Sequence, residues 1–181
     1  MKSLPSVILL IFLVFTGKMQ AQEKIHWMTV SEMEVAMTKE PRKVLIDVYT
    51  SWCGPCKMMM SQTFTNPDII AYINEHYYAV KFNAEGNESI SFKGVNYVNP
   101  SYNPDNANRR NGTHNFTKAI APVNGKIAYP TIVYLNEKLE IIAPVQGFWK
   151  KEQYMPLLHF IAEEIYLTPT PFDTYQQEFN K

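Results

Sequence analysis

Two cysteines, Cys53 and Cys56, are the residues of this chain best suited to covalent chemistry, and they are its only cysteines. They lie three positions apart in the hexapeptide WCGPCK (52–57), which we place between a strand and the helix that follows it. At a helix N-terminus, unpaired backbone N–H groups and the helix dipole favour a negative charge, so the pKa of the Cys53 thiol should fall from ~8.5 toward ~7. Cys53 is therefore predicted to attack disulfides as a thiolate. Cys56, on the same helix face and expected to be more buried, is predicted to displace the reduced target from the mixed disulfide.

The cysteine pair has two alternative uses, a structural crosslink and a metal site. A disulfide that closes a four-residue loop removes little chain entropy, so a purely structural role explains the pair poorly. A zinc site needs about four ligands, usually with a second Cys or His pair at matching spacing. The four histidines are instead scattered singly, at His26, His76, His114 and His159. We therefore expect no metal and no other cofactor.

Composition sets limits on the class of protein. The 181 residues fit one domain, and with 46% hydrophobic and 19% charged residues they can form a packed core. Seventeen basic residues balance seventeen acidic ones, so there is no basic surplus of the kind that binds nucleic acid. We expect no nucleic-acid partner.

The N-terminal residues 1–21 have the order of a secretory signal peptide. Lys2 is followed by nine apolar residues at 7–15 and by a polar stretch that ends at Ala21. The apolar run is shorter than the about 20 residues needed to span a bilayer, and an uncleaved anchor is the alternative. We predict an exported protein, periplasmic if the source is a Gram-negative bacterium, with no stable membrane insertion after signal cleavage.

Local patterns predict helices that alternate with strands. Ser31 is expected to cap the first helix, with Glu34 at the capping-box position, and Thr113 to cap a later one. Residues 84–113 are rich in Asn, Gly, Pro and Ser without a period, and we expect them to be irregular. These elements predict an α/β fold, a mixed sheet flanked by helices. The expected helices are 31–39, 57–62, 68–76, 113–121 and 151–166, and the expected strands are 43–50, 77–83, 131–135 and 141–145.

Several segments resemble the thioredoxin-fold family in the correct order. WCGPCK matches the thioredoxin active-site motif residue for residue, and the resemblance covers roughly residues 25–166. It implies a thioredoxin-like three-layer sandwich with a central mixed β-sheet flanked by helices. We therefore divide the chain into a signal peptide, a thioredoxin-like domain at 22–166 and a C-terminal tail at 167–181. The other matching segments are IDV at 46–48, KFNAE at 81–85, YPT at 129–131 and VQG at 145–147.

The resemblance also implies functions for single residues. Asp47 is implied to be a buried acid that takes or relays the proton of Cys56, with Lys81 paired to it; a solvent-facing acid is the alternative. Pro130 is implied to be cis, leaving the backbone at Tyr129 free to hydrogen-bond a substrate segment, with an ordinary trans proline as the alternative. The implied catalytic residues are Cys53, Cys56, Asp47 and Lys81. The implied substrate-binding residues are Trp52, Gly54, Pro55, Tyr129 and Pro130. Trp52 would shield one side of the cysteines, and simple packing in the core is the alternative.

An insert at about 86–118 departs from the family pattern. Such loops commonly determine which partner binds, and a purely structural excursion is the alternative. The Gly54-Pro55 dipeptide resembles the reducing members of the family, with potentials near about −270 mV rather than ~−120 mV. The hypothesis is a thiol-disulfide oxidoreductase that reduces disulfide-bearing exported proteins and receives electrons from a membrane thiol-disulfide donor. The alternatives are a disulfide isomerase or oxidase, and a redox-switched binding module that uses the insert.

Overall fold

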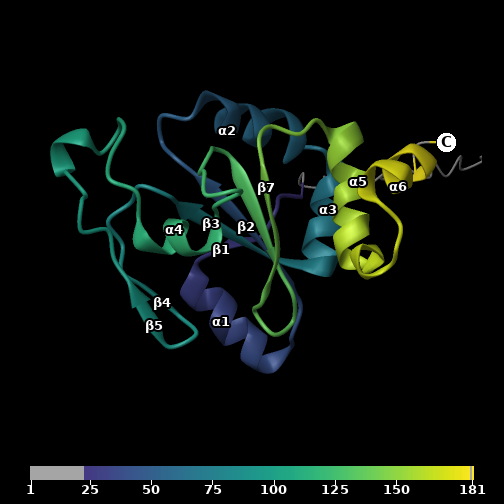
Figure 1. The fold of residues 1–181 in the computed structure, drawn as a ribbon, viewed down its shortest axis with the longest axis horizontal. Coiled ribbons are helices and arrows are strands. Elements are labelled where there is room, and N and C mark those ends of the chain that lie inside the picture. The colour runs from purple at the N-terminus through teal and green to yellow at the C-terminus, as the bar shows by residue number, and fades with distance from the viewer. Residues whose placement is uncertain (1–22, 180) are drawn as a thin grey trace, which may run out of the picture.

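The computed structural model describes residues 23–179 and 181. A five-stranded mixed sheet carries helices on both faces, so the α/β sandwich that the sequence predicted is confirmed (Figure 1). The proposed signal peptide at 1–21 lies outside the described residues, and it stays a prediction. Within the described part of the chain, no helix is long and apolar enough to cross a membrane.

The sheet is built around the strand that precedes the cysteine motif. Its order is β1-β3-β2-β6-β7, so β2 lies at the centre. β2 runs parallel to β3 and antiparallel to β6, which makes the sheet mixed. All residues of β2 except Tyr49 are buried, as expected for an apolar strand covered on both faces. The strands are β1 (Trp27–Met28), β2 (Lys43–Tyr49), β3 (Tyr77–Asn83), β6 (Thr131–Leu135) and β7 (Ile141–Gln146).

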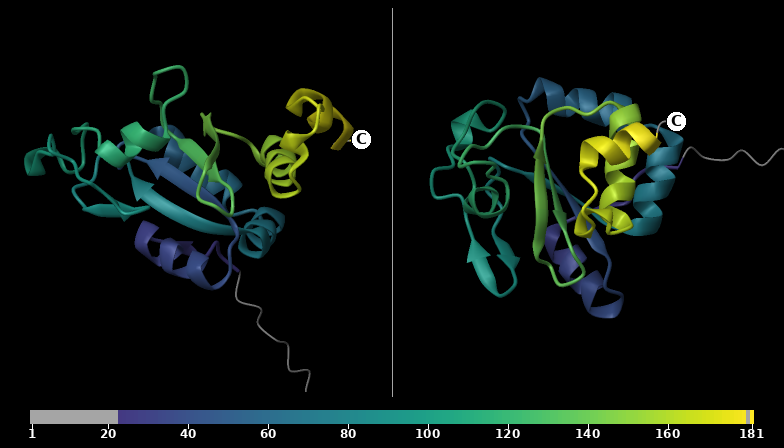
Figure 2. Two further views of the ribbon diagram at one scale, coloured as in Figure 1. Left: turned by 60° about the horizontal axis from the view of Figure 1, so that its bottom comes forward. Right: turned by 45° about the vertical axis from the view of Figure 1, so that its right-hand side comes forward.

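Alternation along β2 sends its side chains into two separate cores. Leu45 packs into the first core with α3 (Pro67–His76) and α5 (Lys151–Ala162). Val44, Ile46 and Val48 face the opposite way, into the second core with α1 (Val30–Lys39) and α4 (Asn115–Ile120). Figure 2 shows the helices around the sheet from two further sides.

Two helix starts differ from the sequence-based expectation. The first helix begins at Val30, and Thr29 caps it in a capping box with Glu32, whereas Ser31 was expected. Both Thr29-x-x-Glu32 and Ser31-x-x-Glu34 fit the capping-box pattern; helix formation directly after β1 selects the earlier one and buries Val30. α4 is capped by His114 rather than by Thr113, because the His114 ring accepts a hydrogen bond from the Phe116 N–H at 3.0 Å.

The insert is more ordered than its sequence indicated. It contains a hairpin of β4 (Ile90–Phe92) and β5 (Val95–Tyr97), and it leads into α4. Phe116 of α4 contacts the rings of Phe92 and Tyr97 on one side and of Phe82 in β3 on the other. The expectation of an irregular segment was therefore wrong for this hairpin: three-residue strands are too short to show a period, and the second core holds them in place.

The C-terminal region also differs from the expectation. α5 ends at Ala162, because Glu164 takes a left-handed conformation with φ of 59°, and a 3₁₀ turn at Ile165–Leu167 follows. The region expected to be a polar tail contains α6 (Phe172–Phe179), which packs on α5 through Phe160. In both figures the insert (teal) and α6 (yellow) lie at opposite ends of the molecule.

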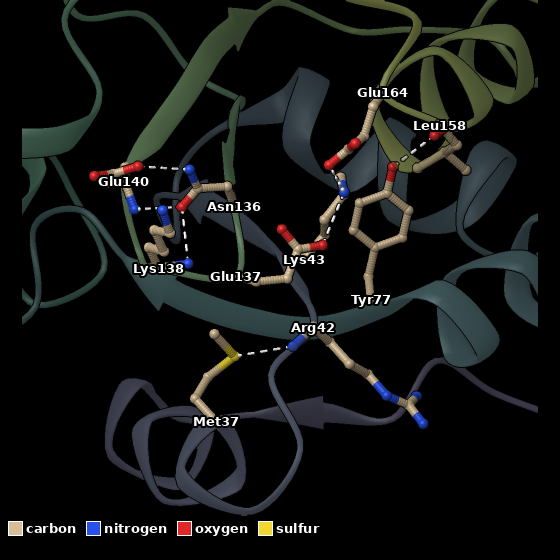
Figure 3. A network of polar contacts seen from close by, with 10 residues as sticks. All are labelled: Met37, Arg42, Lys43, Tyr77, Asn136, Glu137, Lys138, Glu140, Leu158 and Glu164. Atoms are coloured by element: carbon tan, nitrogen blue, oxygen red, sulfur yellow. Dashed lines mark hydrogen bonds and ion pairs between the residues drawn. The ribbon is translucent and has the colours of Figure 1, made fainter. Parts of the chain in front are cut away.

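A buried lysine joins three elements at the end of the sheet away from the cysteine motif. Lys43, at the start of β2, is 5% exposed and forms ion pairs with Glu137 at 2.8 Å and Glu164 at 3.1 Å (Figure 3). Burial alone would lower the pKa of Lys43, but the hydrogen bonds and charges of the two glutamates outweigh it and raise this pKa. The β6–β7 turn and the end of α5 are thereby tied to the central strand.

Candidate active site

The two cysteines form a disulfide at the junction of β2 and a helix, where the sequence placed them. α2 (Gly54–Met58) begins directly after Cys53 and continues as a π-helical segment, Met59–Thr63. Cys53 is the N-cap residue, and its sulfur accepts a hydrogen bond from the Cys56 N–H at 3.1 Å. Pro55 lies in the first turn, where no intrahelical partner for its nitrogen is needed.

The expectation that Cys56 is clearly the more buried cysteine was wrong for this oxidised form. Cys53 is 2% exposed and Cys56 4%. The disulfide brings both sulfurs together, and Trp52 of the motif and residues of the insert lie beside Cys53. What distinguishes the two cysteines is the surroundings that each one faces.

Cys53 and Cys56 line two different hollows. We call the first the Cys53 groove, with a volume of about 520 Å³, and the second the Cys56 pocket, with about 230 Å³. The Cys53 groove is lined by residues 52–55, by Glu85, by Arg110, Asn111 and Thr113 of the insert, and by 127–129. The Cys56 pocket is lined by Cys56, Lys57, Met60, Lys81 and the strand-end residues 49–51.

Asp47 is a buried acid in the central strand, so the solvent-facing alternative is excluded. It is 2% exposed, and burial raises its pKa to about 6, although the charge of Lys81 acts to lower it. Asp47 and Lys81 are register partners in the parallel β2–β3 pair. An acid with this pKa can hold a proton at mildly acidic pH and release it near neutrality.

Lys81 does not contact Asp47 directly, in contrast to the implied pairing. Within the described residues no ion pair joins the two side chains, although the two residues are register partners. The Lys81 ammonium instead lies 3.1 Å from the Met60 sulfur and over the rings of Trp27 at 5.5 Å and Tyr49 at 4.9 Å. Lys81 therefore acts on Asp47 as a nearby positive charge.

Trp52 is held between several partners beside Cys53. Its indole N–H donates to the Glu85 carboxylate at 2.7 Å, and the same oxygen accepts the backbone N–H of Asn111 at 2.8 Å. The Arg110 guanidinium lies over the indole at 4.8 Å, and the Tyr129 ring meets its edge at 6.0 Å. Trp52 is thus a half-buried wall of the groove and not a residue of either core.

Pro130 follows a cis peptide bond, as the resemblance implied. Tyr129 lines the Cys53 groove, and burial raises the pKa of its hydroxyl. The structure therefore gathers Trp52, Gly54, Pro55 and Tyr129 around Cys53, while Pro130 is buried just behind them.

Sequence reasoning did not assign six residues that line the groove: Glu85, Arg110, Asn111, Thr113, Ile127 and Ala128. Glu85 lies in a segment that resembles the family, and an acid two residues after the end of a strand is a signal of its own. Arg110 and Asn111 lie in the insert, where no pattern indicated which residues would turn toward the cysteines.

The histidines that were weighed as metal ligands stay apart from the cysteines. His114 is buried, with one ring nitrogen bonded to the Phe116 N–H and the other 2.8 Å from the Glu88 carbonyl oxygen, so it is structural. Among residues 23–179 and 181, no three His, Cys, Asp or Glu side chains gather closely enough to hold a metal ion.

Comparison with solved structures shows the same fold at low sequence identity. A thioredoxin-fold protein from Helicobacter pylori is 16% identical with a TM-score of 0.55, over 76% of this chain and 80% of that one. The DsbH oxidoreductase is 13% identical with a TM-score of 0.51, over 83% of this chain and 92% of that one. A putative disulphide isomerase from Bacteroides thetaiotaomicron is 20% identical with a TM-score of 0.51, over 83% of this chain and 100% of that one.

The family of this chain is shown by a family model and not by these solved structures. A search of curated proteins by sequence found no match, and identities of 20% or less show a shared fold alone. The model of a thioredoxin-like domain matches residues 30–162, which is well over half of the chain. The chain therefore belongs to the thioredoxin-like family, and its Cys53–Cys56 disulfide lies in the CXXC site of that fold.

Proposed function

We propose that this protein is a thiol-disulfide oxidoreductase that reduces disulfides in exported proteins. The observation that carries the proposal is a Cys53–Cys56 disulfide at a helix start, with Cys53 lining an open groove. A disulfide that served only as a crosslink would not need a groove, a buried acid and a half-buried lysine, Lys81, around it.

In the first step, the reduced Cys53 attacks a substrate disulfide as a thiolate. The Cys53 sulfur bonds to one substrate sulfur, and the other substrate sulfur leaves as a thiolate that takes a proton. The Cys56 N–H, which already donates to the Cys53 sulfur, stabilises the attacking thiolate in the same way.

In the second step, Cys56 attacks the Cys53 sulfur of the mixed disulfide. This re-forms the Cys53–Cys56 disulfide and releases the second substrate cysteine as a thiol. The Cys56 thiol must first lose its proton, and we assign Asp47 as the acceptor because its pKa of about 6 lies close to neutral pH. The nearby charge of Lys81 favours the ionised acid between cycles.

The cellular setting is part of the proposal. Export rests on the signal-peptide pattern at 1–21, and the reducing direction rests on the Gly54-Pro55 dipeptide. A thiol-disulfide donor in the membrane would return the Cys53–Cys56 pair to the dithiol form, which keeps electrons balanced over the cycle.

The direct test is reduction of insulin by dithiothreitol with the mature protein (22–181) and its Cys53→Ser variant. We expect the wild type to accelerate the reaction and the variant to do nothing, because a hydroxyl in place of the Cys53 thiol cannot form a mixed disulfide. Equal rates of insulin reduction with the wild type and with Cys53→Ser would contradict an enzymatic function. A redox titration of the cysteine pair tests direction: a potential above roughly −150 mV would contradict a reductase and favour an oxidase or isomerase.

A redox-switched binding module is the second candidate, since the insert forms an ordered wall beside Cys53. It predicts binding of a partner that depends on the redox state of the cysteines, without turnover. Catalytic reduction of insulin at a small fraction of the substrate concentration would exclude a pure switch.

A further inference from the structure

The Cys53 groove has a wall that comes from the insert and not from the thioredoxin-like sheet. On one side lie Gly54 and Pro55 of the motif, and on another lies Tyr129. Arg110 and Asn111 complete the groove from the insert. A peptide that presents its disulfide to Cys53 must pass along this wall.

Hydrogen bonds within the insert hold this wall in place. The Asn111 side chain accepts the backbone N–H of Asn103 at 2.7 Å and donates to the Asn103 carbonyl at 2.8 Å. The amide of Asn99 donates to the Gly86 carbonyl at 2.9 Å and to the Gly112 carbonyl at 2.6 Å. The segment that carries Arg110 is therefore fixed at both ends relative to the end of β3.

Two charged residues line the groove, Glu85 and Arg110, and they differ in how many of their hydrogen-bonding groups are already used within the protein. Glu85 is 9% exposed, and one of its oxygens already accepts hydrogen bonds from Trp52 and Asn111. Arg110 is exposed and its guanidinium lies over the Trp52 ring at 4.8 Å, and it forms no ion pair with any residue that the structure describes. A contact with a ring face uses no N–H group as a hydrogen-bond donor to oxygen, so the guanidinium N–H groups can still donate to a carboxylate.

We propose that Arg110 makes this protein selective for disulfides in extended peptide segments that carry Asp or Glu next to the reacting cysteine. This inference rests on the proposed function, since it names the substrate class of the same site. A carboxylate beside the substrate cysteine can accept two hydrogen bonds from the guanidinium while the disulfide lies against Cys53. The indole beneath Arg110, which Glu85 holds through the indole N–H, keeps the cation at the groove, so less ordering is needed on binding.

The test compares two peptide disulfides that differ only in having Glu or Lys next to one cysteine. The mature protein is assayed with dithiothreitol, and kcat/KM is measured for each peptide. We expect the wild type to prefer the Glu peptide by about 5-fold at low salt, and this ratio should shrink at high salt. Arg110→Gln should bring the ratio close to one, and Arg110→Glu should favour the Lys peptide.

The chain offers a matched control in Arg109. It is exposed and precedes Arg110 in the same segment, but it does not line the groove. Arg109→Glu changes the net charge as Arg110→Glu does, so it should leave the Glu-over-Lys preference unchanged. An equal loss of preference in both variants would show a general charge effect and overturn the inference.

Insulin reduction separates the two possible failures. If the wild type reduces insulin but shows no preference between the peptides, or reduces neither peptide, the inference is wrong and the proposed function stands. If it reduces neither insulin nor the peptides, the proposed function itself fails. Far-ultraviolet circular dichroism of both Arg110 variants confirms that a changed ratio is not caused by unfolding.

Discussion

The two sides of the disulfide are built in different ways. On the Cys56 side, Lys81 of β3 lines the pocket beside Met60 and the Tyr49 ring, and its register partner Asp47 is buried in β2. On the Cys53 side, Glu85 follows β3, and the insert supplies Arg110 and Asn111 at the edge of a larger groove. The first side is the smaller hollow and is built mainly from the sheet and the motif helix, whereas the second is larger and is completed by the insert.

This difference fits a division of the reaction between the two sides. Proton transfer benefits from a low-dielectric site, where burial shifts the pKa of an acid toward neutral pH, as it does for Asp47. Substrate recognition benefits from an accessible surface with unused hydrogen-bond donors, such as Arg110. Under the proposed function, the insert would determine the substrate and the strands would determine the proton chemistry.

The largest expected effect comes from Cys56→Ser, which removes the resolving thiol and leaves the groove intact. Mixed disulfides with substrate should accumulate, and turnover should fall by about 1,000-fold because the intramolecular attack is lost. Non-reducing gels and mass spectrometry measure the trapped species. Cys53→Ser should trap nothing, because Cys56 faces the smaller pocket. Equal amounts of mixed disulfide in both variants would mean that Cys53 and Cys56 do not have different functions in attack and resolution.

Asp47→Asn tests the Cys56 side by its dependence on pH. Burial raises the pKa of Asp47 from 3.8 to about 6, so the folded protein binds this proton more tightly than the unfolded chain does. The free energy of unfolding should therefore fall as pH rises from about 4 to about 6, by about 3 kcal/mol in total, and then level off. Asn does not ionise, so the variant should lose this dependence and be more stable than the wild type above pH 6.

Urea unfolding between pH 4 and 8 measures this effect, and the exposed Asp105→Asn is the matched control. Insulin reduction by Asp47→Asn should also be slower at neutral pH, by about 10- to 100-fold, if Asp47 accepts the Cys56 proton. Parallel stability curves for the wild type and Asp47→Asn would contradict the assignment of Asp47 as a buried acid with a raised pKa.

Glu85→Gln tests the Cys53 side, where a smaller effect is expected. The Glu85 carboxylate accepts charge-assisted hydrogen bonds from Trp52 and Asn111, which Gln can replace only in part. We expect the free energy of unfolding to fall by about 1–2 kcal/mol and KM for the acidic peptide to rise. Glu88→Gln is the control, because the Glu88 side chain is exposed and does not line the groove. Equal effects in both variants would mean that Glu85 does not hold the wall.

The Cys56 side could be predicted from the sequence because each of its parts leaves a local signal. A single acid in the apolar run of β2 indicates a buried ionisable group, and the motif after it indicates a strand-to-helix junction. The sequence of β3 (77–83) also predicts a strand, and this placed Lys81 in the sheet. Its ammonium could not be placed, since its contacts with Trp27 and Met60 depend on packing between elements.

The resemblance placed Trp52, Gly54, Pro55 and Tyr129 at Cys53, but the insert's part of this side could not be predicted, because it depends on contacts across long stretches of chain. Arg110 reaches Trp52 across more than fifty residues, and the insert shows no period that would fix its path. The β4–β5 hairpin is stabilised by Phe116 and Phe82, which lie outside it, so its own sequence carries little signal. Alternative caps caused smaller errors, as at Thr29 and Ser31, where two overlapping patterns competed.

Thr50 gives the smallest expected effect, at the point where the two sides meet. Its carbonyl accepts the Cys53 N–H at 3.2 Å, and the residue lines the Cys56 pocket. Its buried hydroxyl has no hydrogen-bond partner among the described residues. Val keeps the shape of Thr and removes the unpaired hydroxyl, so Thr50→Val should raise the free energy of unfolding of the oxidised protein by about 1 kcal/mol.

Urea unfolding of the oxidised protein measures this change, with Thr50→Ser as the control. Ser keeps the hydroxyl and loses a buried methyl group, so it should be less stable than the wild type by about 1 kcal/mol. A destabilised Thr50→Val would mean that the hydroxyl has a partner in solution. The Cys56 pocket, which Thr50 lines, would then be more polar than the structure indicates, and the contrast between the two sides would be weaker.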